Sequence, residues 1–186
     1  MKTMTDTTGA VSSGLVALIL GLALISGAEA ATTVSGQINA TLTLTNSCQI
    51  NGAAPGPGTT NFGTLNFGTQ TAQFATATGQ VMNSSGTAVT VLCSPGSAPT
   101  FKVLAGTNDG KGTGGSRALS DGATHFVGYD LFSDAAFANV LAANAVINLG
   151  TSTGVAQAVN VYGKAVGATG LPAGTYTDIV AVELSF

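Results

Sequence analysis

The 186-residue chain has no tryptophan, a single histidine, two cysteines and little charge, since only 7% of its residues are Asp, Glu, Lys or Arg. Five basic residues stand against eight acidic ones, which leaves no basic patch and excludes a nucleic-acid partner. Without tryptophan, and with only three tyrosines, the chain lacks the aromatic platforms of carbohydrate-binding sandwiches. Its surface must instead be covered by uncharged polar residues, as in many extracellular assemblies.

Catalytic and metal-binding constellations are also lacking. A nucleophilic triad needs a histidine between a nucleophile and an orienting acid, and Asp121 and Asp130 do not give the lone His125 that arrangement. A metal site needs more ligands than His125, Cys48 and Cys93 can supply. We therefore expect no enzymatic activity, no cofactor and no metal.

Residues 1–30 have the pattern of a secretory signal peptide. Lys2 supplies the positive start, residues 15–25 form an apolar core, and Ala28, Glu29 and Ala30 form a small-residue cleavage site. The apolar run is shorter than the roughly 20 residues that a membrane-spanning helix needs. The sequence therefore predicts an exported protein whose mature chain begins near residue 31 and has the size of one domain.

The two cysteines of this exported chain are Cys48 and Cys93. An even pair in an oxidising compartment predicts a disulfide, and two separate free thiols are the alternative. Closing a loop of this length would stabilise the fold by about 4 kcal/mol in the chain-entropy model.

The mature chain shows no sustained helical period, and Gly, Thr, Ser and Asn interrupt it at short intervals. Short segments separated by such residues are typical of an all-β sandwich. The segment 135–145, although rich in alanine, is expected to be a loop or short turn. Strands are expected over 34–50, 61–67, 80–82, 89–93, 100–104, 124–132, 145–149 and 158–166, and from 176 to the end.

The first and last of these strands alternate apolar and polar residues along their length. Alternation with a period of two places one set of side chains on each side of a strand. Exposed strand edges promote pairing with other chains, so an exported domain with such ends is expected to polymerise. The apolar set of the first strand is Val34, Gly36, Ile38, Ala40 and Leu42, and that of the last is Val180, Val182, Leu184 and Phe186.

Several segments together resemble the spore coat protein U domain family, which includes subunits of archaic chaperone–usher pili. The resemblance covers the whole mature chain, and its most specific part is the ending LPAGTYTDIVAVELSF over 171–186. The other segments are VSGQINATLTLTNSC (34–48), NFGTLNFGT (61–69), TAVTVLC (87–93), VGYDLFSDAA (127–136) and VNVYGKAV (159–166).

The resemblance implies an incomplete immunoglobulin-like Greek-key sandwich that lacks its last strand. A periplasmic chaperone would first lend that strand to the 180–186 edge. At an outer-membrane usher, the N-terminal strand of the next subunit would then replace it. Residues 31–44 would be this donor strand, with Val34, Gly36, Ile38, Ala40 and Leu42 entering the groove, and 45–186 the pilin domain.

The function expected on this basis is a structural pilus subunit that acts at the cell surface in adhesion and biofilm formation. With one domain and a donor-strand candidate, the chain matches a shaft subunit better than a tip adhesin. The alternative is a stand-alone secreted β-sandwich, either a coat protein or a carbohydrate-binding module.

Overall fold

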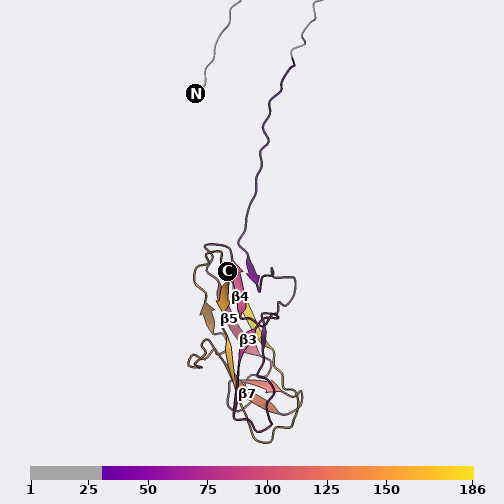
Figure 1. Cartoon of the computed structure of the whole chain (residues 1–186), viewed down its shortest axis with the longest axis vertical. Helices are drawn as coiled ribbons and strands as arrows, with labels where there is room; N and C mark the ends of the chain where they lie inside the picture. The colour runs from indigo at the N-terminus through magenta and orange to yellow at the C-terminus, as the bar shows by residue number, and fades with distance from the viewer. Residues whose placement is uncertain (1–30) are drawn as a thin grey trace, which may run out of the picture. The chain divides into compact units, whose positions relative to one another are not determined.

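The structure, a computed structural model, describes residues 31–186, so the predicted signal peptide lies outside the described residues (Figure 1). The described residues form strands, turns and loops, and among them there is no helix long and apolar enough to cross a membrane. The strands are β1 (Cys48–Ile50), β2 (Thr64–Leu65), β3 (Thr76–Met82), β4 (Val89–Cys93), β5 (Thr100–Gly106), β6 (Arg117–Ser120), β7 (Phe126–Phe132), β8 (Val146–Asn148), β9 (Gln157–Val159), β10 (Tyr162–Val166) and β11 (Val180–Ser185).

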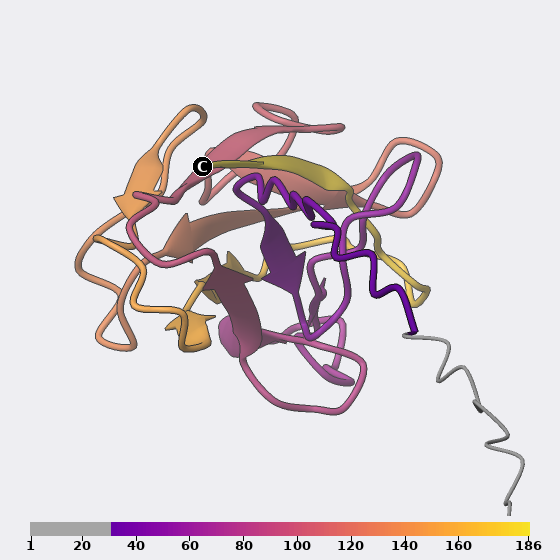
Figure 2. The same ribbon diagram turned by 90° about the horizontal axis from the view of Figure 1, so that it is seen from above.

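The strands pair antiparallel in three sheets around a common interior (Figure 2). The largest sheet has the order β2-β3-β10-β7-β6, and the two smaller ones have the orders β11-β5-β8 and β1-β4-β9. The predicted all-β sandwich is therefore confirmed. In this order β2 and β11 are both edge strands, each paired on one side only.

The core is built from the inward-facing residues of the alternating strands. In β4, Val89, Val91 and Cys93 are buried, whereas the residues between them are partly exposed. β5 repeats the pattern with Phe101 and Val103. Burying one large apolar side chain contributes roughly 1.5–3 kcal/mol, so this alternation supplies much of the driving force for folding.

Cys48 and Cys93 form the predicted disulfide. They are directly opposite each other in the antiparallel pair β1–β4, and both are almost fully buried. The bond therefore ties the first strand of the sandwich to the middle strand of its sheet.

The N-terminal strand expected over 34–50 is present only at Cys48–Ile50. Residues 31–47 have no regular secondary structure, and the compact sandwich spans Thr43–Phe186. A strand is stable only when its backbone N–H and C=O groups find partners, and residues 34–46 pair with no strand within this single chain. The prediction of a strand there was wrong for the isolated chain.

Most of the other expected strands are present, although β2 covers only Thr64–Leu65 of the expected 61–67 and β11 begins at Val180 and not at 176. β3 is longer than expected, because it begins at Thr76, and the expected strand 158–166 is divided into β9 and β10. The segment 135–145 contains turns and an isolated bridge between Val140 and Phe132, as expected of a loop. β6 is not among the strands expected from the sequence.

Candidate strand-binding groove

A groove of about 560 Å³ opens between the two edge strands β2 and β11. One wall is the segment 59–65, and the other is the segment 178–182 at the start of β11. The floor includes the core side chains Val103, Leu131 and Val161. The interior of the sandwich is therefore accessible from outside along this line, where a further strand would complete the covering of the core.

A second hollow, also of about 560 Å³, continues from the first and shares Leu65, Phe67 and Leu119 with it. Its walls are the segments 65–72 and 171–176. Along the two hollows, one wall runs from 59 to 72 while the opposite wall runs from 182 back to 171. The two walls therefore contain 14 and 12 residues, close to the 11 residues of the segment 34–44.

The β2 wall is joined to the core by two aromatic side chains in addition to the pairing of β2, which contains only two residues, with β3. Phe62 packs edge-to-face on Phe101 and Phe67 on Tyr129, with ring centroids 5.5 and 5.8 Å apart. Each phenylalanine lies in an N-F-G turn in which the asparagine side chain accepts a hydrogen bond from the glycine N–H. The repeated N-F-G units therefore fasten one wall of the groove to the core.

The wall formed by β11 has the predicted alternation. Val180, Val182 and Leu184 are half-buried and pack against the core, and the first two line the groove. Phe186 follows the strand and is 51% exposed, so it is less embedded than the other three. The pairing of β11 with β5 shifts register between Val180 and Val182.

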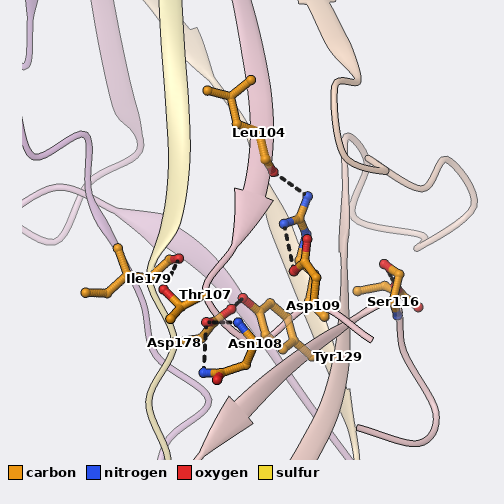
Figure 3. A network of polar contacts seen from close by, with 10 residues as sticks. Leu104, Thr107, Asn108, Asp109, Ser116, Tyr129, Asp178 and Ile179 are labelled. Atoms are coloured by element: carbon orange, nitrogen blue, oxygen red, sulfur yellow. Dashed lines mark hydrogen bonds and ion pairs between the residues drawn. The ribbon is translucent and has the colours of Figure 1, made fainter. Parts of the chain in front are cut away.

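One polar cluster interrupts the apolar lining, at Asp178 and Tyr129 (Figure 3). The Asp178 carboxylate accepts hydrogen bonds from the Tyr129 hydroxyl at 2.8 Å and from the backbone N–H and side-chain amide of Asn108, both at 3.2 Å. Burial, and then the bond to this carboxylate, raise the pKa of Tyr129 far above its usual range. Tyr129 therefore stays a neutral donor at any physiological pH.

A buried arginine lies next to this cluster. Arg117 of β6 is 1% exposed, and its guanidinium donates to the Leu104 carbonyl at 3.0 Å and lies 3.5 Å from an Asp109 carboxylate oxygen. Gly106 lies between the side chains of Asp109 and Asp178 and leaves no room for a larger residue. A Cβ on Gly106 would lie 2.6 Å from a carboxylate oxygen of each. No motif in the sequence predicts this cluster, since its members are far apart along the chain.

The candidate catalytic residues form no site. His125 is paired with Asp121, with His125 Nδ1 2.7 Å from the carboxylate, at the hairpin between β6 and β7. A hydrogen bond from the Ala123 N–H, followed by the one to His125, lowers the pKa of Asp121. Within residues 31–186 no three His, Cys, Asp or Glu side chains are grouped so as to hold a metal ion.

The predicted donor residues are uncovered in the single chain. Val34 is 89% exposed, Ile38 is 96% exposed, and Leu42 is similarly exposed. Exposed apolar side chains in such a row are unusual for the surface of a soluble protein.

The comparisons with known proteins give the family. The model of the spore coat protein U domain matches residues 34–183. The chain belongs to the spore coat protein U domain family. The match includes the exposed N-terminal segment as well as nearly all of the sandwich, so the spore coat protein U domain is longer than the compact unit.

Among solved structures, one match is the crystal structure of the CsuC–CsuE chaperone–tip adhesion subunit pre-assembly complex from archaic chaperone–usher Csu pili of Acinetobacter baumannii. The identity is 22%, the TM-score is 0.45, and the match covers 77% of this spore coat protein U domain chain and 40% of the solved chain. Among curated proteins no significant match was found.

Proposed function

We propose that the chain is a structural subunit of a surface pilus assembled by the chaperone–usher pathway through donor-strand exchange. The observation that carries this proposal is an apolar groove that reaches the core between two edge strands, in a chain with an exposed alternating N-terminal segment. Addition of an extended segment to an exposed sheet edge is a common way in which proteins bind peptides. A second copy of the chain supplies such a segment.

In this proposal Val34, Gly36, Ile38, Ala40 and Leu42 of one subunit enter the groove of the next and pair with β11. Before assembly, a periplasmic chaperone covers the same groove with a strand of its own, and an outer-membrane usher is the place of exchange. The finished fibre stands on the cell surface and serves adhesion and biofilm formation. Membership in the spore coat protein U domain family supports this reading.

The alternative of a stand-alone secreted sandwich predicts a monomer. The test is electrophoresis of the purified full-length protein in SDS with and without prior boiling. Donor-strand exchange predicts a ladder of oligomers that survives SDS and collapses to one band on boiling, because each bound strand is part of its neighbour's core. A single monomer band in both samples would favour the stand-alone sandwich.

Gly36 provides a test of register. Glycine weakens a strand unless another surface approaches closely, so its presence in the inward-facing row indicates a shallow part of the groove. Gly36→Leu is therefore expected to reduce the number of pili strongly, whereas Gln37→Leu, which changes the outward face, is expected to have a mild effect. Pili are counted by electron microscopy. Equal numbers of pili in the two variants would mean that this face does not enter a groove.

The β11 wall provides a test of the chaperone step. Val182→Ser and Phe186→Ser are both expected to lower the level of subunit in the periplasm. Val182→Ser should have the larger effect, because Val182 lines the groove and Phe186 is half-exposed. An uncovered groove exposes the subunit to aggregation and degradation.

Glu183→Ser, on the exposed side of the same strand, is the control. Subunit levels are measured by immunoblotting of periplasmic extracts, together with co-purification of the chaperone. Wild-type accumulation of the Val182 and Phe186 variants would contradict the assignment of this wall.

A further inference from the structure

We propose that the polar cluster around Asp178 is a brace that holds the β11 wall ready for an incoming strand, with Asp178, Tyr129 and Asn108 as positioning residues. The inference rests on the proposed function, and it concerns how fast the groove takes up a strand. The cluster touches the groove directly, since Tyr129 and Asp178 are among its lining residues.

The brace joins the wall to two other elements. Tyr129 reaches Asp178 from β7, in the largest sheet, and Asn108 reaches it from the loop after β5. The next residue of the wall is held in the same way, because the Ile179 carbonyl accepts hydrogen bonds from the backbone N–H and the hydroxyl of Thr107, at 3.0 and 3.2 Å. Figure 3 shows these groups converging on residues 178 and 179.

The loop that supplies Thr107 and Asn108 is fixed in turn. Asp109 faces the buried Arg117, and the guanidinium also binds the Leu104 carbonyl of β5, near the register shift opposite β11. Further along the loop, the backbone around Gly115 lies so close to β7 that a Cβ on Gly115 would clash with the backbone of Tyr129. The loop is thus packed onto β7, and its Thr107–Asn108 end is held against the groove wall.

Holding the wall in place matters for strand uptake because ordering a residue costs free energy. Fixing a backbone residue in one conformation costs conformational entropy, and a binding site that is already ordered avoids that cost at the moment of binding. If Asp178 no longer holds the wall, residue 178 must be ordered when the strand enters, whereas Ile179 is still held by Thr107. We therefore expect the strand to be taken up about tenfold more slowly, the factor that corresponds to about 1.4 kcal/mol.

The test uses the full-length chain with Ile38→Asp as the parent, so that the protein does not fill its own groove by polymerisation. A fluorescent peptide with the sequence of residues 31–47 is added, and its uptake is followed by anisotropy. Asp178→Ala removes all three hydrogen bonds, and Tyr129→Phe removes only the one from the hydroxyl. Tyr129→Phe keeps the aromatic packing and so serves where Asp178→Ala fails to fold.

Asp134→Ala is the matched control. The Asp134 carboxylate also holds a loop, by accepting hydrogen bonds from the N–H groups of Ala136, Ala138 and Asn139 and from the Asn139 side chain. Asp134 does not line either hollow of the groove. Its loss is therefore expected to lower the melting temperature without changing peptide uptake.

The expected result is uptake about tenfold slower in Asp178→Ala and about threefold slower in Tyr129→Phe, as for the loss of hydrogen bonds of ordinary strength. The Asp134→Ala variant should take up peptide at the parent's rate. Parent-like uptake in both brace variants, or equal slowing in all three, would overturn the brace. A parent that takes up no peptide at all would instead overturn the proposed function on which the brace depends.

Discussion

Replacing Ile38 by aspartate is expected to abolish pilus formation while leaving the subunit folded. In the proposed assembly, Ile38 enters an apolar groove whose floor is the core of the neighbouring sandwich. A carboxylate there would be buried without a partner, which costs roughly 3–5 kcal/mol. In the free subunit the same side chain is 96% exposed, so the substitution should not affect the stability of the sandwich. Electron microscopy of the cells and electrophoresis of unboiled samples measure the outcome.

Asn39→Asp is the control for this substitution. It introduces the same charge one residue later, on the opposite face of an extended segment, where a carboxylate stays in water. We expect this variant to form pili, and we expect both variants to accumulate in the periplasm, because their grooves are unchanged. Normal fibres from Ile38→Asp would mean that residues 34–42 are not the donor strand, and the proposed mechanism would be wrong for this chain.

Most of the sandwich could be predicted from local patterns in the sequence. Val89, Val91 and Cys93 alternate with partly exposed residues, and this period of two is a direct consequence of strand geometry. The disulfide could be predicted because an exported chain with an even number of cysteines passes through an oxidising compartment. The same reasoning gave the inward face of β11, where Val180 and Val182 line the groove.

The N-terminal segment shows what alternation alone does not determine. Residues 34–45 alternate as regularly as β4, yet they form no strand in the single chain. Alternation reports which face of a strand would be apolar, whereas strand formation also needs a neighbour for the backbone hydrogen bonds. The sequence therefore predicted the faces of this segment but not whether a partner is present.

The polar brace could not be predicted because it depends on tertiary contacts. Asp178 and Tyr129 are 49 residues apart, and Asp178 and Asn108 are 70 apart. Arg117 begins a strand of four residues with too short a pattern to indicate burial, and charged residues are almost never fully buried unless paired. One feature of the sequence did point to Arg117. Charged residues are scarce in this chain, so an arginine directly after a glycine-rich loop is a candidate for a specific ion-pair or hydrogen-bond partner.

Replacing both Cys48 and Cys93 by alanine is expected to have the largest effect on stability. The disulfide closes a loop with a sequence separation of 45, which the chain-entropy model equates with about 4 kcal/mol. That is a large share of the roughly 5–15 kcal/mol by which a domain is normally stable. Because both residues are buried in the core, the lost sulfur atoms add a packing defect to the entropic effect.

Measurements with and without reductant separate the chain-entropy contribution of the bond from the packing contribution of the two sulfur atoms. The wild-type protein should lose most of its extra stability in dithiothreitol, whereas the alanine variant should melt at the same temperature with and without the reagent. The remaining difference between reduced wild type and variant then measures the packing of the two sulfur atoms. The measurement is thermal unfolding followed by circular dichroism. If the oxidised wild type and the variant melted together, the bond between β1 and β4 would contribute nothing to the sandwich. The floor of the groove belongs to the same core cluster as these cysteines. In that case the apolar contacts of the other core residues alone would maintain the shape of the groove.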